Sequence, residues 1–176
     1  MALDRTAPPS PPSAAPAHRA ADPAAPPPFL GPAWAEAVRA AVDSGPPPEV
    51  RAAKLDKYWT WIERRRADYT ATWVLGVRGA PAALGSTRRD ITLEWSGGRC
   101  ARVAVTAPDA STPPGTYVLS AEYAVWRRLL SGEDPGRVLM YRQMRLEHGD
   151  VLLFFRGVYF FVESLAALAR VPAAVP

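Results

Sequence analysis

The sequence has few of the side chains that build disulfides and transition-metal sites. It holds one cysteine, Cys100, and two histidines, His18 and His148, among 176 residues. A single cysteine excludes an internal disulfide and a cysteine-based zinc cluster, and two histidines are too few for most protein-built metal sites. Neither a phosphate-binding glycine loop nor a dinucleotide-binding fingerprint is present. We therefore expect no metal and no cofactor.

Long apolar runs are also missing. The most apolar window, Val151–Val162, has 12 residues and contains Arg156, whereas a membrane-spanning helix needs about 20 apolar residues. No transmembrane segment is therefore expected. The N-terminal region shows no basic segment followed by an apolar run, so the sequence predicts no secretory signal and a cytoplasmic location.

The first 28 residues contain almost no apolar side chains apart from alanine and proline. They hold 9 of the 20 prolines and no aromatic residue, while all Trp, Tyr and Phe residues lie further along the chain. Such a segment cannot bury enough apolar surface to offset the entropy lost on ordering. We predict a disordered tail over residues 1–28 and one domain over residues 29–176, a length typical of a single core.

Lysine is scarce, and the formal net charge of +4 comes from arginine. The run Arg64–Arg66 is the densest cluster. An arginine-rich, alanine-rich composition is also the product of GC-rich coding, so the charge alone does not indicate nucleic acid as a partner. Basic residues can attract an anionic membrane surface, which leaves peripheral membrane contact open, although a solvated helix end is the simpler interpretation.

Hydrophobic periodicity predicts an α+β protein. Helical spacing indicates helices near residues 32–44 and over Glu49–Arg66, and alternation with a period of two indicates strands. The predicted strands are Tyr69–Val77, Ile91–Trp95, Cys100–Thr106, Thr116–Leu119 and Arg142–His148. The glycine pair after Trp95 is typical of a tight hairpin. We expect a five-stranded, mostly antiparallel sheet covered by helices.

Three further helical segments follow from capping signals. Ser120 is predicted to cap a helix that ends before Gly132, and Asp134-Pro135 begins a short helical turn. Asp150 is predicted to cap a final helix over 151–168. That helix is apolar almost all the way round, which a helix with a solvated face cannot be. A sheet, a ligand or a partner must cover it.

This order of elements resembles the sterol-carrier-protein-type lipid-binding domain. The resemblance spans Phe29 to about Arg170 and is carried by short motifs in the same order. These motifs are Phe29-Leu30 with Trp34 and Val38 in the first helix, Trp126 with Leu129-Leu130-Ser131-Gly132-Glu133-Asp134-Pro135, and Gly149-Asp150 before the last helix. Two features depart from the family pattern: Tyr141–Gln143 replaces a segment that commonly carries glycine, and the region around Tyr58, Trp59 and Trp61 is unusually aromatic.

The resemblance implies an internal hydrophobic cavity for a fatty acyl, sterol-like or polyketide ligand. The residues expected to bind it are the large apolar side chains of the sheet face and the covering helices, together with one histidine, and most of them fit a solid core equally well. They are Trp59, Trp73, Leu75, Trp95, Val103, Trp126, Leu130, Met140, Met144, His148, Phe154, Phe155, Val158 and Phe161.

Two other functions stay open at this stage. A biosynthetic enzyme could use the same cavity to hold an intermediate in a reactive conformation for cyclisation or rearrangement. A protein-interaction module could bury the apolar last helix against a partner or a second copy. Alternation places Cys100 on the face opposite Val103, Asp150 is simplest as a helix cap, and His148 shares the face of Met144. The sequence assigns neither a catalytic residue nor an oligomeric state.

Overall fold

Five strands form one mixed sheet in the order β3-β2-β1-β4-β5. The computed structural model describes residues 25–108 and 112–176, so most of the tail predicted over residues 1–28 lies outside it. The strands are β1 (Ala71–Arg78), β2 (Arg88–Ser96), β3 (Arg99–Thr106), β4 (Thr116–Glu122) and β5 (Met144–His148). Only the β1–β4 pair within this sheet is parallel. The predicted α+β class and the mostly antiparallel five-stranded sheet are confirmed.

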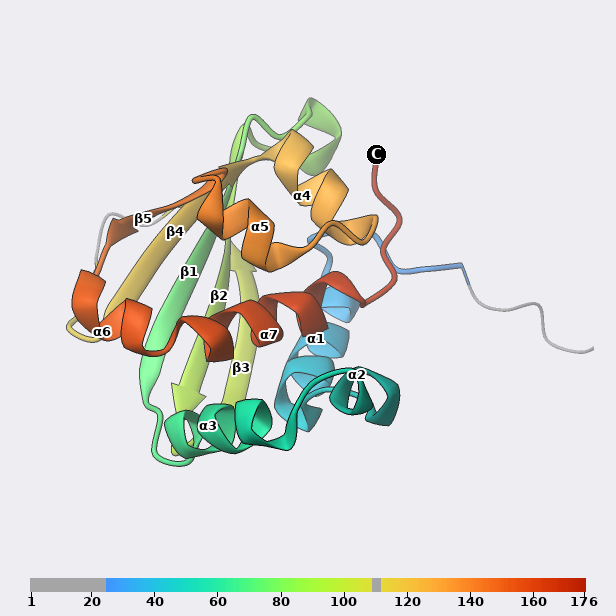
Figure 1. Cartoon of the computed structure of the whole chain (residues 1–176). Helices are drawn as coiled ribbons and strands as arrows, with labels where there is room; N and C mark the ends of the chain where they lie inside the picture. Colours follow the sequence, from blue (N-terminus) through green and yellow to red (C-terminus); the bar gives the residue numbers. More distant parts are fainter. Residues whose placement is uncertain (1–24, 109–111) are drawn as a thin grey trace, which may run out of the picture.

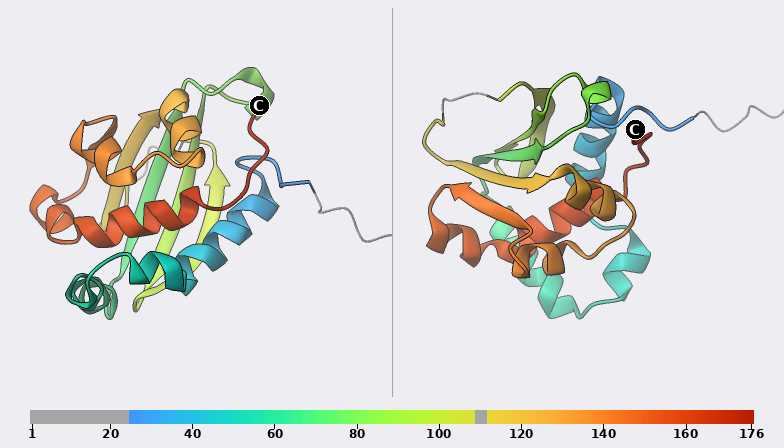
Figure 2. Two further views of the ribbon diagram at one scale, coloured as in Figure 1. Left: turned by 45° about the vertical axis from the view of Figure 1, so that its right-hand side comes forward. Right: turned by 90° about the horizontal axis from the view of Figure 1, so that it is seen from above.

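Helices cover one face of the sheet (Figures 1 and 2). They are α1 (Pro32–Ser44), α2 (Pro48–Ala52), α3 (Asp56–Arg66), α4 (Tyr123–Leu130), α5 (Pro135–Met140), α6 (Val151–Arg156) and α7 (Val158–Ala169), with a 3-10 turn, η1, at Ala82–Leu84. Helix α7 lies at the centre of this layer and contacts α1, α3, α4 and α5. Within the part of the chain that the structure describes, no helix is long and apolar enough to cross a bilayer.

Two predicted helices are each divided in the structure. The prediction of one helix over Glu49–Arg66 is wrong because Leu55 is extended, with φ −65° and ψ 143°, and separates α2 from α3. The Trp59 indole donates a hydrogen bond to the Arg51 carbonyl at 2.8 Å, which folds α3 back on α2. The last helix, predicted over residues 151–168, is interrupted at Gly157, the residue between α6 and α7. Glycine is a weak helix former, and this break lets the two segments face different surroundings.

Ser120 is not a helix cap. It is a fully buried residue of β4, which pairs with β1 as far as the Arg78–Glu122 register and with β5 at Ala121. Helix α4 therefore begins three residues later, at Tyr123. Pairing on both sides of β4 satisfies more backbone groups than a local serine cap would, so tertiary context overrides the capping signal.

Two β-bulges reverse the side-chain parity that alternation predicts. Trp95 pairs with Cys100 but Glu94 pairs with Arg102, which leaves Ala101 as an extra residue. A bulge shifts later side chains to the other face, so Cys100 and Val103 share one face, contrary to the prediction.

The second bulge lies in β5. Leu119 pairs with Leu146, but the neighbouring Val118 pairs with His148, which makes Glu147 the extra residue. His148 therefore leaves the face of Met144 and Leu146, and the prediction that it shares that face is wrong. The strand itself begins at Met144, two residues later than predicted, because Arg142 has a φ of 57° that a strand does not allow.

Gly97 and Gly98 make the β2–β3 turn, as predicted. Both have positive φ, 53° and 76°, which is the conformation of a type I′ hairpin. A Cβ atom on Gly98 would lie 2.3 Å from the Arg66 carbonyl oxygen. This turn therefore packs directly against the end of α3 and fixes that helix over the sheet.

The two ends of the described chain lie side by side. Phe29 donates a hydrogen bond to the Ala174 carbonyl at 2.9 Å, and Ala174 donates to the Pro27 carbonyl at 2.8 Å. Pro28 and Ala174 form an isolated parallel bridge. The folded part therefore includes Pro27 and Pro28, which the sequence assigns to the tail.

Candidate ligand-binding site

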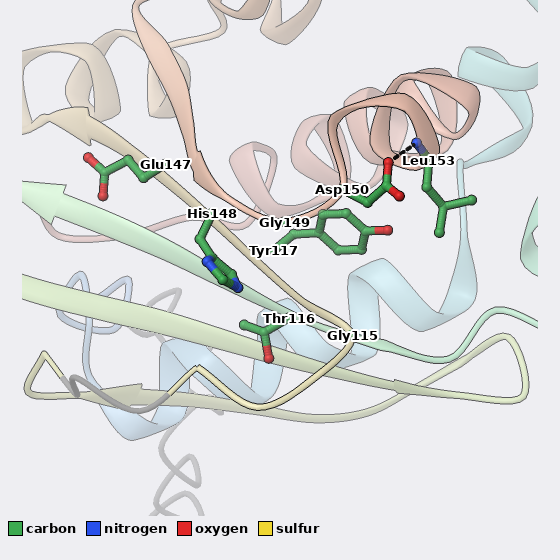
Figure 3. A pocket seen from close by; sticks show the side chains of 8 residues that line it. All are labelled: Gly115, Thr116, Tyr117, Glu147, His148, Gly149, Asp150 and Leu153. Carbon is green, nitrogen blue, oxygen red and sulfur yellow. Dashed lines mark hydrogen bonds between the residues drawn. The ribbon is translucent and has the colours of Figure 1, made fainter.

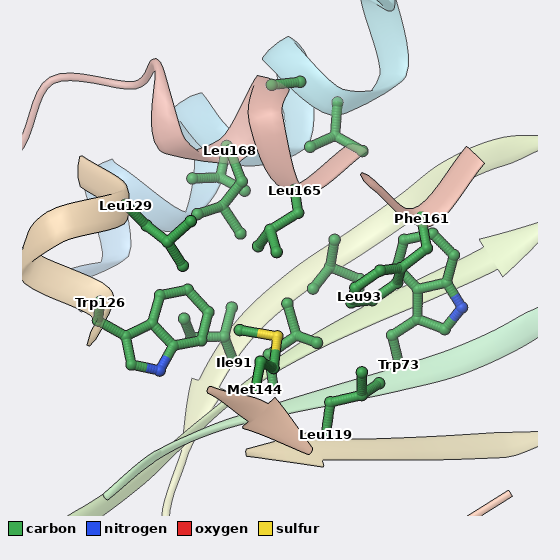
Figure 4. Packing of buried hydrophobic residues seen from close by; sticks show 14 of the residues in the cluster. Trp73, Ile91, Leu93, Leu119, Trp126, Leu129, Met144, Phe161, Leu165 and Leu168 are labelled. Carbon is green, nitrogen blue, oxygen red and sulfur yellow. The ribbon is translucent and has the colours of Figure 1, made fainter. Parts of the chain in front are cut away.

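An aromatic cluster fills the layer between the sheet and the helices. The Trp73 ring lies 5.0 Å from both Trp95 and Phe161, and the Trp95 ring lies 4.8 Å from Phe160. Figure 4 shows Trp73 and Phe161 at one end of this layer, and Trp126 and Leu129 at the other. Most of these rings meet edge to face, an arrangement that adds to the energy of burial. The space expected to hold a ligand is occupied by side chains in this structure.

Most of the predicted ligand-binding residues lie in this layer. Seven are buried within it, and three are half-buried at its boundary. The buried seven are Trp73, Leu75, Trp95, Trp126, Met144, Phe154 and Phe161, and the half-buried three are Val103, Leu130 and Val158. The sequence pattern thus placed ten of the predicted residues in or beside one common interior.

The other four predicted residues lie elsewhere. Trp59 is buried between α2, α3 and α7 and lines a separate cavity of about 160 Å³. Met140 at the end of α5 is 77 % exposed, and Phe155 on α6 is 56 % exposed, so neither lines the interior in this structure. His148 is exposed because the bulge at Glu147 turns it to the opposite face of the sheet.

The centre of the aromatic cluster is closed to five cavities of the described residues. None of the five is lined by Trp73, Trp95 or Met144, and Phe160 lines only the small cavity beside Trp59. The largest, about 730 Å³, lies on the helix-free face of the sheet and is lined there by Thr92, Ala104 and other residues, with Thr112 and Pro113 from the β3–β4 connection. We call it the open-face groove. Four of its charged residues form ion pairs within it, Arg88 with Asp90 and Arg102 with Glu94, and Glu147 at its edge pairs with Arg78.

A second cavity, about 550 Å³, lies where β4 and β5 meet the start of α6 (Figure 3). Asp150 accepts a hydrogen bond from the Leu153 backbone N–H at 2.9 Å, so it caps α6 as predicted. The Tyr117 ring lies under this turn, and a Cβ on Gly149 would come within 2.5 Å of it. On its inner side Tyr117 is 5.8 Å from Phe154. One aromatic pair therefore separates this cavity from the interior.

Several polar groups inside the helix layer are hydrogen-bonded, although the buried indole N–H groups of Trp34 and Trp95 have no partner among the described residues. The Tyr69 hydroxyl accepts a hydrogen bond from the Trp73 indole at 2.8 Å, and burial raises the pKa of Tyr69 to about 12. Glu163 on α7 is buried and accepts hydrogen bonds from Lys54 and from the Tyr58 hydroxyl. Burial, followed by the hydrogen bond to Glu163, raises the pKa of Tyr58. These contacts tie the α2–α3 hairpin to α7.

The candidates for catalysis do not converge. Cys100 on β3 and His148 on β5 belong to strands at opposite edges of the sheet, so they cannot form a nucleophile–base pair. Burial raises the pKa of the Cys100 thiol to about 11, which keeps it neutral near pH 7. Glu147 accepts hydrogen bonds from Ser120 and Arg78, and Tyr141 is exposed. Among the described residues no cluster of metal-ligating side chains is present.

Helix α6 is held against the helix layer by a single buried side chain. Its one buried side chain is Phe154, whose ring lies 5.1 Å from Phe161. The other four apolar side chains, Val151, Leu152, Leu153 and Phe155, are each more than half exposed. The apolar pattern of the sequence placed this segment in one buried helix and did not reveal its exposure. The glycine at position 157 was the signal that could have separated it from α7.

Comparisons with known proteins define the fold. No protein-family model matches the sequence, and no curated protein matches it either. Among solved structures, a crystal structure of sterol carrier protein 2 is similar, with a TM-score of 0.61 and 18 % identity over 82 % of this chain and 99 % of that chain. The solution structure of a conserved hypothetical protein from Thermus thermophilus, titled as a possible sterol carrier protein, gives 0.60 and 20 % over 86 % and 94 %. The chain thus has the fold of the sterol carrier protein 2 domain.

Proposed function

We propose that this domain binds an apolar or amphipathic small molecule, such as a fatty acyl, sterol-like or polyketide compound, and serves as its carrier or as an accessory in its pathway. The observation that carries the proposal is the state of α6. This helix covers one end of an aromatic interior, is anchored by one side chain and leaves its other apolar side chains in water. A helix held so weakly is suited to move when a ligand enters.

The ligand site lies between α6, the first turns of α7 and the sheet. Gly157 is the hinge, because it joins the two helices and carries no side chain that packs against either. When α6 swings outward, Phe154 leaves its contacts with Tyr117 and Phe161. The ligand then replaces Phe154 against those rings and shields them from water. Its own apolar area supplies the driving force, at roughly 25 cal/mol per Å² buried.

The similar solved structures support the choice of ligand class. One of them is named sterol carrier protein 2 and the other is titled as a possible sterol carrier protein. The open-face groove is the competing location. Its walls carry threonines and internally paired charges rather than large apolar side chains, which suits an apolar ligand poorly.

Native mass spectrometry of the untagged protein, followed by organic extraction, tests the function. We expect an acyl or polycyclic molecule at close to one copy per chain, or stoichiometric uptake of a fluorescent fatty acid by the extracted protein. Extracted protein that takes up no member of a fatty acyl, sterol and polyketide panel would overturn the proposal.

Two substitutions test the location. Phe154→Ala removes the anchor and is expected to speed association of the fluorescent fatty acid, while energy transfer from the interior tryptophans to the probe persists. Ala104→Trp fills the open-face groove, since Ala104 lines it, and is expected to leave binding unchanged. The reverse pattern, in which Ala104→Trp abolishes binding and Phe154→Ala has no effect, would place the ligand on the open face and contradict the proposed site.

A further inference from the structure

The exposed apolar side chains of α6 continue onto α7 and α3. Leu152, which is 79 % exposed, and Phe155 lie three residues apart on one side of α6, and Tyr159, which is 52 % exposed, lies in the first turn of α7, two residues after Gly157. The Tyr159 ring lies 5.5 Å from the rings of Tyr58 and Trp61 on α3. We call Leu152, Phe155, Tyr159 and Trp61 the interfacial patch. Isolated exposed apolar residues are ordinary, whereas a contiguous set indicates a binding surface.

Unpaired cations surround this patch. On α3, Lys57, Arg64 and Arg65 lie four residues before, three after and four after Trp61, so they share its side of the helix. Arg156 lies on α6 beside Phe155. All four are exposed, and none forms an ion pair or a side-chain hydrogen bond within the described residues. The Arg65 guanidinium lies 5.5 Å from the centre of the Trp61 ring.

The clustering of these four cations next to exposed rings makes the group useful for docking. Several other arginines on the surface have carboxylate partners, such as Arg39 with Glu36 and Arg128 with Glu133, whereas Arg127 on α4 has none among the described residues. The carboxylate of Glu63 on α3 is bonded to Arg51 and so does not neutralise its neighbour Arg64. Asp56 lies at the first turn of α3, where the helix dipole favours it. The interfacial patch therefore has a positive rim.

We propose that the interfacial patch docks on the surface of an anionic lipid bilayer. Leu152 and Phe155 enter the boundary between head groups and acyl chains, the rings of Trp61 and Tyr159 lie at head-group depth, and Lys57, Arg64, Arg65 and Arg156 contact lipid phosphates. Apolar side chains rimmed by aromatic rings and basic residues match the layers of such a surface. A second copy of the chain fits less well, because a two-fold contact would bring the same four cations of each copy together.

Docking does not require a bound ligand, but it gives α6 a role in the proposed function. The helix that covers the interior also carries the side chains that enter the lipid. Opening at Gly157 would then take place against the membrane, so that an apolar ligand passes between bilayer and protein without crossing water.

Co-sedimentation with vesicles tests the docking. We expect binding to equimolar phosphatidylglycerol–phosphatidylcholine vesicles and much weaker binding to pure phosphatidylcholine vesicles. Each of Arg64→Gln and Arg65→Gln should lower partitioning about fivefold, because a basic residue near an anionic surface contributes about a factor of five. Phe155→Ser should lower it at least as much, and added salt should weaken the wild type more than the arginine variants.

Matched controls keep the test specific. Met140→Ser removes an apolar side chain outside the patch that is more exposed than Phe155, and Arg127→Gln removes an exposed, unpaired cation on α4, so both should bind vesicles like the wild type. Three results would overturn the proposal: no preference for anionic vesicles, equal losses in Met140→Ser and Phe155→Ser, or a dimer in sedimentation velocity that Phe155→Ser dissociates. Probe binding measured without vesicles reports the proposed function separately, so failure of one does not imply failure of the other.

Discussion

The two phenylalanines that meet beneath α6 provide the sharpest test of how this helix is held. Phe154 on α6 is 6 % exposed and Phe161 on α7 is 2 % exposed, with their rings 5.1 Å apart. Replacing a buried phenylalanine by alanine in a rigid core costs about 3–5 kcal/mol. We expect Phe161→Ala to show this full cost. For a folded part of this size it lowers Tm by about 10–16 °C.

Phe154→Ala should behave differently, because α6 can leave the core without the rest unfolding. Its docking depends on one buried ring, worth about 1.5–3 kcal/mol, and on the Asp150 cap, worth about 1 kcal/mol. The loss of global stability is therefore limited to roughly 3 kcal/mol. The larger effect is local, since α6 becomes undocked in a substantial fraction of molecules.

Hydrogen exchange distinguishes the two outcomes. The Phe154 amide donates to the Asp150 carbonyl and the Gly157 amide donates to the Phe154 carbonyl, each at 2.9 Å, so both report on α6. In Phe154→Ala their protection should fall by about 30- to 160-fold, as a loss of 2–3 kcal/mol requires, while amides of α7 and β1 change little. An equal fall in α6, α7 and the sheet would refute the view that α6 opens independently.

Other predictions follow from individual contacts. Gly98→Ala should destabilise the protein by several kcal/mol in urea unfolding, because the added Cβ meets a carbonyl of α3 at 2.3 Å, whereas Gly97→Ala, with open space, should cost about 1 kcal/mol. Cys100 should resist thiol reagents at pH 8 until the chain unfolds, since burial raises its pKa from 9.0 to about 11. The folded state then holds the thiol proton more tightly than the unfolded state does. The protonated thiol therefore adds roughly 2–3 kcal/mol to the free energy of unfolding below pH 9, and this contribution is lost by pH 11. An equally steep fall in the stability of Cys100→Ala between pH 9 and pH 11 would contradict this. Deleting residues 1–24 should leave Tm unchanged in calorimetry, whereas deleting residues 1–28 should lower it, because residues 27–29 pair with the C-terminal segment.

Local sequence rules were reliable where neighbouring residues settle the conformation. The glycine pair at 97–98 adopts the positive φ that its composition indicates, and Asp150 caps α6 through its own backbone neighbours. The face that Trp73 and Leu75 share was also predicted, since β1 runs without a bulge and the period of two persists.

Sequence rules failed where distant pairing competes with local preference. The bulge at Glu147 moves His148 away from the predicted site, and no local pattern signals it because the register of β5 is set by β4. Ser120 has the signature of a helix cap but pairs as a strand residue between β1 and β5. In both places the backbone N–H and C=O groups form hydrogen bonds with a neighbouring strand that is distant in sequence, and this pairing outweighs the local preference.

The fold class, the order of the main elements and most members of the common interior can be predicted from hydrophobic periodicity, because periodicity is local information. Three features depend on tertiary packing instead: the interior is packed with rings, α6 lies at its edge with one buried anchor, and Lys57, Arg64 and Arg65 lie near apolar side chains about 90 residues away. Those features depend on how α3 and α7 meet over the sheet, and packing between elements remote in sequence leaves no periodic signal in either segment.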